Sequence, residues 1–148
     1  MGSSVRRRED DRLLAGNGRF LADHAAGAKH VVFVRSTQPH AGITGIDTAA
    51  AEQMPGVHGV FTAADLGLEH TPIPSLTTPD PDFTAATSLV LAEQRLAILA
   101  SDRVHFVGQP IAVVVADDRY LAEDAAEHVV VSYQSLEPVV DAAAALDP

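Results

Sequence analysis

Apolar residues in this chain fall into short runs separated by glycine, proline and polar residues. Five runs are rich in valine, isoleucine or phenylalanine and have the length of strands in a globular domain. They lie at residues 29–36, 57–63, 103–106, 110–116 and 129–134. The run from Ile111 to Ala116 is apolar throughout, so we expect a core strand with both faces covered. Pro110 has no amide hydrogen to donate and therefore starts that strand or lies at an edge.

Two helices are predicted between these runs. Asp47 can cap a short helix over residues 48–54, which the Pro-Gly pair at 55–56 ends. A longer helix follows an aspartate pair and covers residues 119–128, with apolar side chains at four-residue spacing along one face. Because this helix lies between two strands, a right-handed crossover into a parallel or mixed sheet is expected. The fold class is α/β or α+β with short elements.

Two long segments lie outside this pattern. Residues 1–28 carry scattered glycines and little periodicity, which predicts an irregular N-terminal arm. Residues 67–87 contain several prolines and threonines, which predicts a surface loop. The main domain is then expected at 29–141, with a boundary segment at 142–148. A long arm and a long loop bury little within a small domain, so both are predicted to dock on another surface.

Composition narrows the function classes. The formal net charge is −10, which argues against nucleic acid as a partner. No apolar run approaches the roughly 20 residues of a membrane-spanning helix, and no apolar signal follows the first arginines, so we expect a cytoplasmic protein without a membrane partner. The chain has no cysteine, which excludes disulfides, thiol nucleophiles and iron–sulfur ligation by this chain.

Candidate chemistry in the sequence is weak. The seven histidines show no helical metal-site spacing, and a site built through space from His40, His58 or His70 is the less favoured alternative. Ser36 lacks the G-x-S-x-G turn that exposes a nucleophilic hydroxyl. The glycine-containing segment GNGRFLAD at 16–23 lacks the third glycine that a dinucleotide-binding loop requires. We therefore assign no catalytic, cofactor-binding or metal-binding residue.

Four segments, taken in order, resemble the N-terminal region of a known enzyme family. They are RRREDDRLLAGNGRF at 6–20, FVRSTQPHAGITGID at 33–47 with MPGVHGVFTAADL at 54–66, the stretch from 102 to 141 that includes RVHFVGQPIAVVVA, and DAAAALDP at the end. The pattern is similar to the large subunits of xanthine dehydrogenase, aldehyde oxidase and carbon monoxide dehydrogenase. Three residues depart from it: Thr37 replaces a proline, Pro39 a small residue and Gly42 an arginine.

The resemblance implies an α/β hammerhead domain at 29–141. Its fold class is α+β, a mixed sheet of short strands with two main helices and a long irregular arm. In the family, other large-subunit domains hold the molybdopterin cofactor, and partner subunits carry [2Fe-2S] clusters and FAD. This chain is expected to bind no cofactor by itself and to pack, as a non-catalytic segment or split subunit, against the molybdopterin-binding domains and the iron–sulfur and flavin subunits.

Four residues are the predicted contact points of that interface: Arg35, Gly108, Gln109 and Pro110. Gly108 permits close backbone approach and Gln109 offers both a donor and an acceptor, although a plain tight turn explains them equally well. A stand-alone scaffold domain that reuses the hammerhead fold is the alternative function. A carrier domain modified at Lys29 is the third alternative, and an intact mass equal to that of the unmodified sequence would exclude it.

Overall fold

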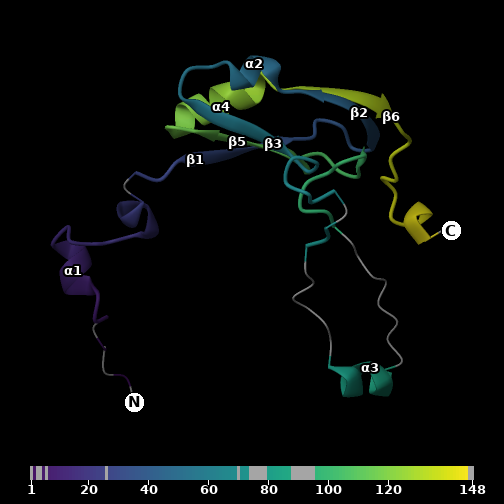
Figure 1. Ribbon diagram of the computed structural model, residues 1–148. Helices are drawn as coiled ribbons and strands as arrows, with labels where there is room; N and C mark the ends of the chain where they lie inside the picture. The colour runs from purple at the N-terminus through teal and green to yellow at the C-terminus, as the bar shows by residue number, and fades with distance from the viewer. Residues whose placement is uncertain are drawn as a thin grey trace.

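The computed structural model describes residues 2, 5, 7–25, 27–69, 71–73, 80–87 and 96–146. Strands β1 (His30–Arg35), β3 (Val57–Thr62) and β5 (Pro110–Ala116) form the first sheet in the order β1-β5-β3. Both pairings are antiparallel. The run ending at Ala116, which was predicted to be a core strand, is the central strand of this sheet, and Pro110 begins it as expected (Figure 1).

The second sheet contains a strand that the apolar pattern did not predict. β2 (Ala41–Asp47) lies between β4 (Arg103–Val104) and β6 (Val130–Ser135), again with antiparallel pairing. Glycines and a threonine interrupt the apolar positions of β2, and its pairing with β6 shifts register between Ile43 and Gly45. Because of these interruptions in its apolar pattern, the sequence did not predict a strand here.

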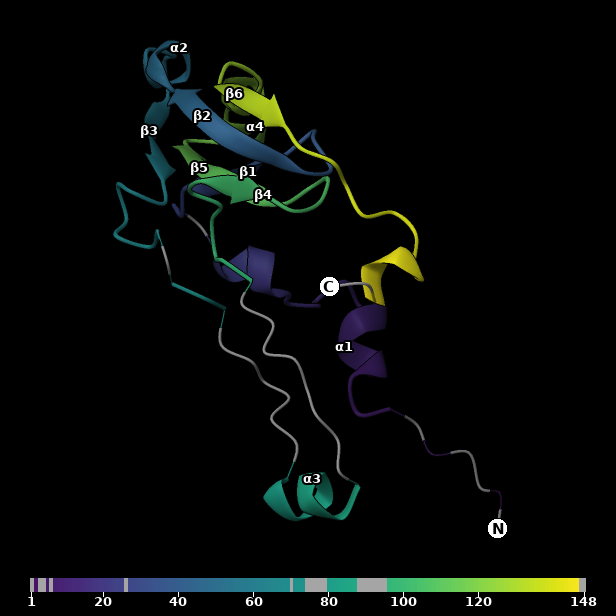
Figure 2. The ribbon, with the colours of Figure 1, turned by 90° about the vertical axis from the view of Figure 1, so that its right-hand side faces the viewer.

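The expectation that the strand–helix–strand connection forms a parallel or mixed sheet is wrong. Helix α4 (Arg119–Glu127) joins the two strands, but they lie in different sheets, and all strand pairings of the described residues are antiparallel. The crossover therefore links the two sheets of the domain instead of adding a strand to one of them, as the two views show (Figure 1, Figure 2).

Two helices cover one face of the first sheet. α4 packs on β1, β5 and β3, and α2 (Ala49–Glu52) packs on β3 and α4. The Asp118 carboxylate caps α4 as predicted and accepts a hydrogen bond from the amide of Leu121 at 3.0 Å. The N-cap residue of α2 is Thr48 and not the predicted Asp47, whose carboxylate still accepts a hydrogen bond from the Ala49 amide at 3.0 Å.

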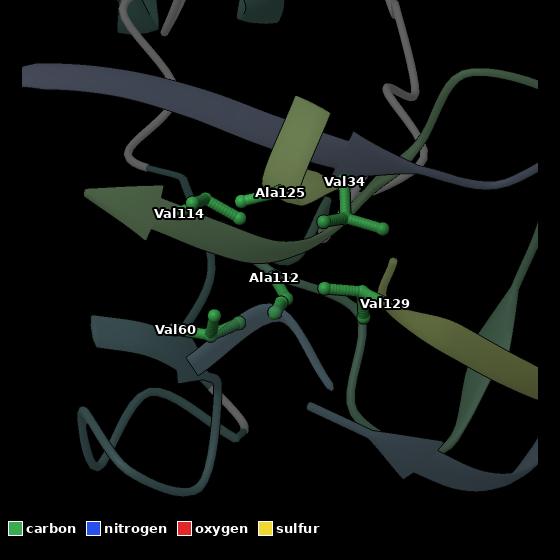
Figure 3. Close-up of a cluster of buried hydrophobic side chains, with 7 residues drawn as sticks. Val34, Val60, Ala112, Val114, Ala125 and Val129 are labelled. Carbon is green, nitrogen blue, oxygen red and sulfur yellow. The ribbon is translucent and has the colours of Figure 1, made fainter. Parts of the chain in front are cut away.

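The main core lies between these helices and the sheet (Figure 3). Val34, Val60 and Val114 point from the three strands toward Ala125 of α4. A second cluster around Ile111 connects β5 to the other sheet. Its fully or almost fully buried members are Ala41, Ala100, Val104 and Ile111. β5 contributes to both clusters, since Ala112 and Val114 lie in the main core and Ile111 in the second, and all three residues are completely buried.

The N-terminal arm and the proline-rich loop contain short helices that the sequence did not predict. α1 (Asp10–Leu14) and a 3-10 turn (Leu21–His24) lie in the arm, and α3 (Pro81–Thr87) lies in the loop, whose residues 74–79 fall outside the described residues. Neither α1 nor α3 buries a residue. A final 3-10 turn (Ala144–Leu146) follows Asp141, whose carboxylate accepts hydrogen bonds from the amides of Ala143 and Ala144. No helix in the described part of the chain is long and apolar enough to cross a bilayer.

The core position of Val114 predicts its contribution to stability. Val114→Ala removes a fully buried side chain from the main core, so we expect the free energy of unfolding to fall by about 2 kcal/mol in urea titrations. Val130→Ala makes the same change at an exposed position of β6 and should alter the free energy of unfolding by less than about 0.5 kcal/mol. Equal effects of the two substitutions would contradict the assignment of the core.

Candidate functional site

The four residues predicted as contact points come together where β1 ends and β5 begins. Arg35 pairs with Pro110 across a register shift that follows Val34. The Arg35 guanidinium donates a hydrogen bond to the carbonyl oxygen of Gly108 at 2.9 Å and lies 5.4 Å from the centre of the Phe33 ring. Gly108 has a φ of 90°, a conformation that favours glycine. The structure thus brings all four residues together, with Arg35 of β1 bound to the turn that leads into β5.

Ser36 closes this turn from the other strand. Its amide donates to the Gln109 carbonyl at 2.9 Å, and its own carbonyl accepts from the Gly108 amide at 2.8 Å. The buried hydroxyl donates to the Gln38 carbonyl and accepts from the Gln38 amide. Ser36 is therefore a structural residue, and both of its hydrogen-bonding roles are used within the turn.

Gln109 points into the protein. Its side chain is 2% exposed, and its Oε1 accepts a hydrogen bond from the His105 amide at 2.7 Å. The residues of this turn that face outward are Phe106 and Val107, which the sequence analysis did not single out. The sequence did contain a signal for an exposed apolar turn here, since two large apolar residues directly precede Gly108. That the turn contacts a partner stays a prediction, but Gln109 supports the turn and does not supply its outer surface.

A hollow of about 290 Å³ lies beside the turn, and Gln109 is part of its wall. Its remaining lining residues include Glu69, Asp102, Arg103 and His105. A phosphate-bearing group such as molybdopterin prefers a wall of amides and cations, whereas two carboxylates here offset the one arginine. The lining of this hollow therefore does not fit that cofactor, and we derive no chemical step from it.

The histidines considered as ligands have other partners. The His40 ring stacks on His105, with centroids 5.8 Å apart and planes inclined by 24°, and its Nδ1 lies 2.7 Å from the Glu137 carbonyl oxygen. Stacked rings do not direct two nitrogen lone pairs at one point. His70 falls outside the described residues. Within the described ranges, no group of three or more metal-ligating side chains occurs.

His58 belongs to a charged cluster at the opposite end of β5. The Asp117 carboxylate accepts hydrogen bonds from the Lys29 ammonium and, at 2.9 Å, pairs with the Nε2 of His58. The Lys29 contact first, and the His58 contact second, lower the pKa of Asp117 from 3.8 to about 2. The cluster joins the starts of β1 and β3 to the end of β5.

A glycine brings the same end of β5 close to α4. Gly56 has a φ of 85°, and its carbonyl accepts from the Asp117 amide at 2.9 Å. This positive φ favours glycine, and a Cβ here would also lie 2.8 Å from Cδ1 of Leu121, so that side chain would have to shift.

Residues 15–137 match the family described as the aldehyde oxidase and xanthine dehydrogenase a/b hammerhead domain. The chain belongs to this family. The match covers both sheets, α2 and α4, and confirms the α+β hammerhead class that the sequence resemblance implied.

Two proteins similar to this hammerhead domain are a large subunit and a large chain of enzymes. The chain is 42% identical over 142 residues to the nicotine 6-hydroxylase large subunit of Paenarthrobacter nicotinovorans, a match that covers 95% of the chain. It is 39% identical over 152 residues to the carbon monoxide dehydrogenase large chain of Afipia carboxidovorans, a match that covers 100% of the chain. The chain spans 16% and 17% of the length of these two proteins.

Solved structures show the same architecture. The carbon monoxide dehydrogenase of Oligotropha carboxidovorans superimposes with a TM-score of 0.81 at 39% identity, over 100% of this chain and 17% of the other. The quinoline 2-oxidoreductase of Pseudomonas putida 86 does so with a TM-score of 0.74 at 38% identity, over 99% of this chain and 18% of the other. The hammerhead domain is thus a small part of each of these chains.

The buried side-chain amide of Gln109 predicts that the stability of the fold is sensitive to substitution at this position. Gln109→Leu removes the acceptor of the His105 amide inside the protein, so the free energy of unfolding should fall by about 1–3 kcal/mol. Gln134→Leu, the same change on the exposed side of β6, is the control and should have an effect within about 0.5 kcal/mol. A stable Gln109→Leu protein would show that the turn does not depend on this hydrogen bond.

The Asp117 cluster predicts a dependence of stability on acid pH. Because folding lowers the pKa of Asp117 from 3.8 to about 2, its ionised form stabilises the fold above pH 3.8, and this contribution is lost as the pH falls toward 2. Asp117→Asn should therefore lower the urea midpoint at pH 6 but have little effect near pH 2. Asp124→Asn, on the exposed side of α4, is the control. A wild-type advantage that persists unchanged at pH 2 would contradict the prediction.

Proposed function

We propose that this chain serves as the hammerhead part of the large subunit of a molybdopterin-dependent hydroxylase or dehydrogenase. The observation that supports the proposal is that 95–100% of the chain matches only 16–18% of a nicotine 6-hydroxylase large subunit, a carbon monoxide dehydrogenase large chain and the gamma subunit of a 6-hydroxypseudooxynicotine dehydrogenase complex. In this role the chain packs against the domains that bind the cofactor, either as a segment of one polypeptide or as a separate subunit.

The role that we infer is structural. The polar side chains at the candidate site, Ser36 and Gln109, are buried and hydrogen bonded within the turn. The carboxylates of the hollow beside them disfavour a phosphate-bearing group. Helices α1 and α3 bury none of their own residues, which supports docking of the arm and the loop on further domains.

The cofactors of the complete enzyme belong to the same proposal. Molybdopterin would lie in the accompanying large-subunit domains, and [2Fe-2S] clusters and FAD in partner subunits. Molybdopterin supplies the redox chemistry when it is bound, and this chain contributes to the shape of the assembly around it. The expectation that the enzyme works in the cytoplasm also stays a prediction.

Co-expression tests this function. The chain is produced together with the remaining large-subunit sequence, which alone carries an affinity tag. We expect both to be recovered together, with molybdenum detected by mass spectrometry and with substrate-dependent dye reduction. The tagged sequence expressed without the chain is the control and should give little active enzyme. An active molybdenum enzyme that forms equally well without the chain, beside a free metal-free monomer of the chain, would overturn the proposal in favour of a stand-alone scaffold.

A further inference from the structure

The register of the first sheet sorts its side chains into two faces. Val32, Val114 and Val60 lie opposite one another across the three strands. Val60 and Val114 belong to the core under α4, so this row faces the helices. Side chains alternate along a strand, and the neighbouring rows must therefore point to the other side of the sheet.

Those neighbouring rows are apolar. Phe33, Val113 and Phe61 form one row across the sheet, and Val31 lies opposite Val115 in the next. Val31 is 53% exposed, Phe33 42% and Phe61 36%, and Val113 and Val115 of β5 are partly exposed. These five residues define the open face. The expectation that both faces of β5 are covered is thus wrong for this side of the strand.

Nothing in the described part of the chain covers the open face. The helices that pack on this sheet are α2 and α4, which belong to the core side. α1 and α3 lie on the side away from α2 and α4 in both views but extend clear of the sheet (Figure 1, Figure 2). Exposed large apolar side chains also occur in the arm that leads to β1, at Leu14, Phe20 and Leu21.

The residue composition of the open face is typical of a permanent protein–protein interface. None of its five residues is polar or charged, although the chain has a net charge of −10. Charged residues border it at both ends of β5, and they are paired: Arg35 contacts the Gly108 carbonyl and the Phe33 ring, while Asp117 binds Lys29 and His58. Contiguous exposed apolar surface is uncommon on monomers, and interface cores without charges are typical of permanent association.

We propose that the open face is the surface on which the accompanying large-subunit domains pack. This inference rests on the proposed function and names the part of the fold that carries it out. More than four fifths of each relative lies outside the region that this chain matches, so a large partner surface accompanies the domain in those proteins. A partner within the same enzyme also has a high effective concentration, which favours it over a second copy of the chain.

Footprinting of the assembled enzyme tests the location. Hydroxyl radicals oxidise exposed phenylalanine and tyrosine, so Phe33 and Phe61 should be protected in the enzyme purified through its tagged large-subunit sequence. Tyr120, which is 76% exposed on α4, is the internal control and should stay reactive. We expect its rate to exceed those of Phe33 and Phe61 by about tenfold, because a permanent interface excludes water. Oxidation of Phe33 and Phe61 in proportion to their present exposure would overturn the inference.

A charged variant tests the energetic role. Val31→Asp combined with Phe33→Asp should reduce recovery of the chain with the tagged large-subunit sequence by at least about tenfold, because each carboxylate would lose its water in the contact. Val130→Asp, at an exposed valine of β6 outside the open face, should leave recovery unchanged. Equal recovery of both variants would overturn the inference while the proposed function stands.

Two further outcomes separate the hypotheses. If the wild-type chain never associates with the large-subunit sequence, the proposed function fails and the inference fails with it. If Phe33 and Phe61 are protected in the chain alone and sedimentation shows a dimer, a second copy occupies the open face and the inference is overturned.

Discussion

The short distance between α4 and the first sheet depends on small side chains at their contact. Ala125 of α4 and Ala112 of β5 are both completely buried in the main core. A larger residue at either position would separate the helix from the strand, since a packed interior has no room to absorb extra methylene groups. Because α4 leads directly into β6, its position also sets where the second sheet lies. Two alanines thus constrain both halves of the domain.

The apolar pattern predicts most of this architecture but not its pairing. The strands β1, β3, β5 and β6 and the helices α2 and α4 follow from apolar runs and aspartate caps. The strand from Ala41 to Asp47 escaped detection because glycines dilute its apolar positions. The order strand–helix–strand suggested a crossover within one sheet. That crossover is blocked, since β1 and β3 already occupy both edges of β5 and leave β6 to pair with β2.

At the candidate site, the sequence predicted the turn but not the directions in which its side chains point. Gly108, Gln109 and Pro110 were expected at a turn, and they form one. Residue type did not reveal that Gln109 is directed inward, since an amide serves an interior hydrogen bond as well as an exposed contact. The apolar residues of β5 likewise suggested burial on both faces, and only the pairing register showed that one row is left open.

The pairing order of the first sheet has a consequence for synthesis on the ribosome. β1 and β3 do not pair with each other, because each needs β5, which is the last of the three strands in the chain. After Thr62 has been made, both earlier strands must wait with their valines and phenylalanines unpaired until Ala116 has left the exit tunnel. During this interval the nascent chain presents two apolar strands without partners, the state in which strands associate with other chains or are held by chaperones.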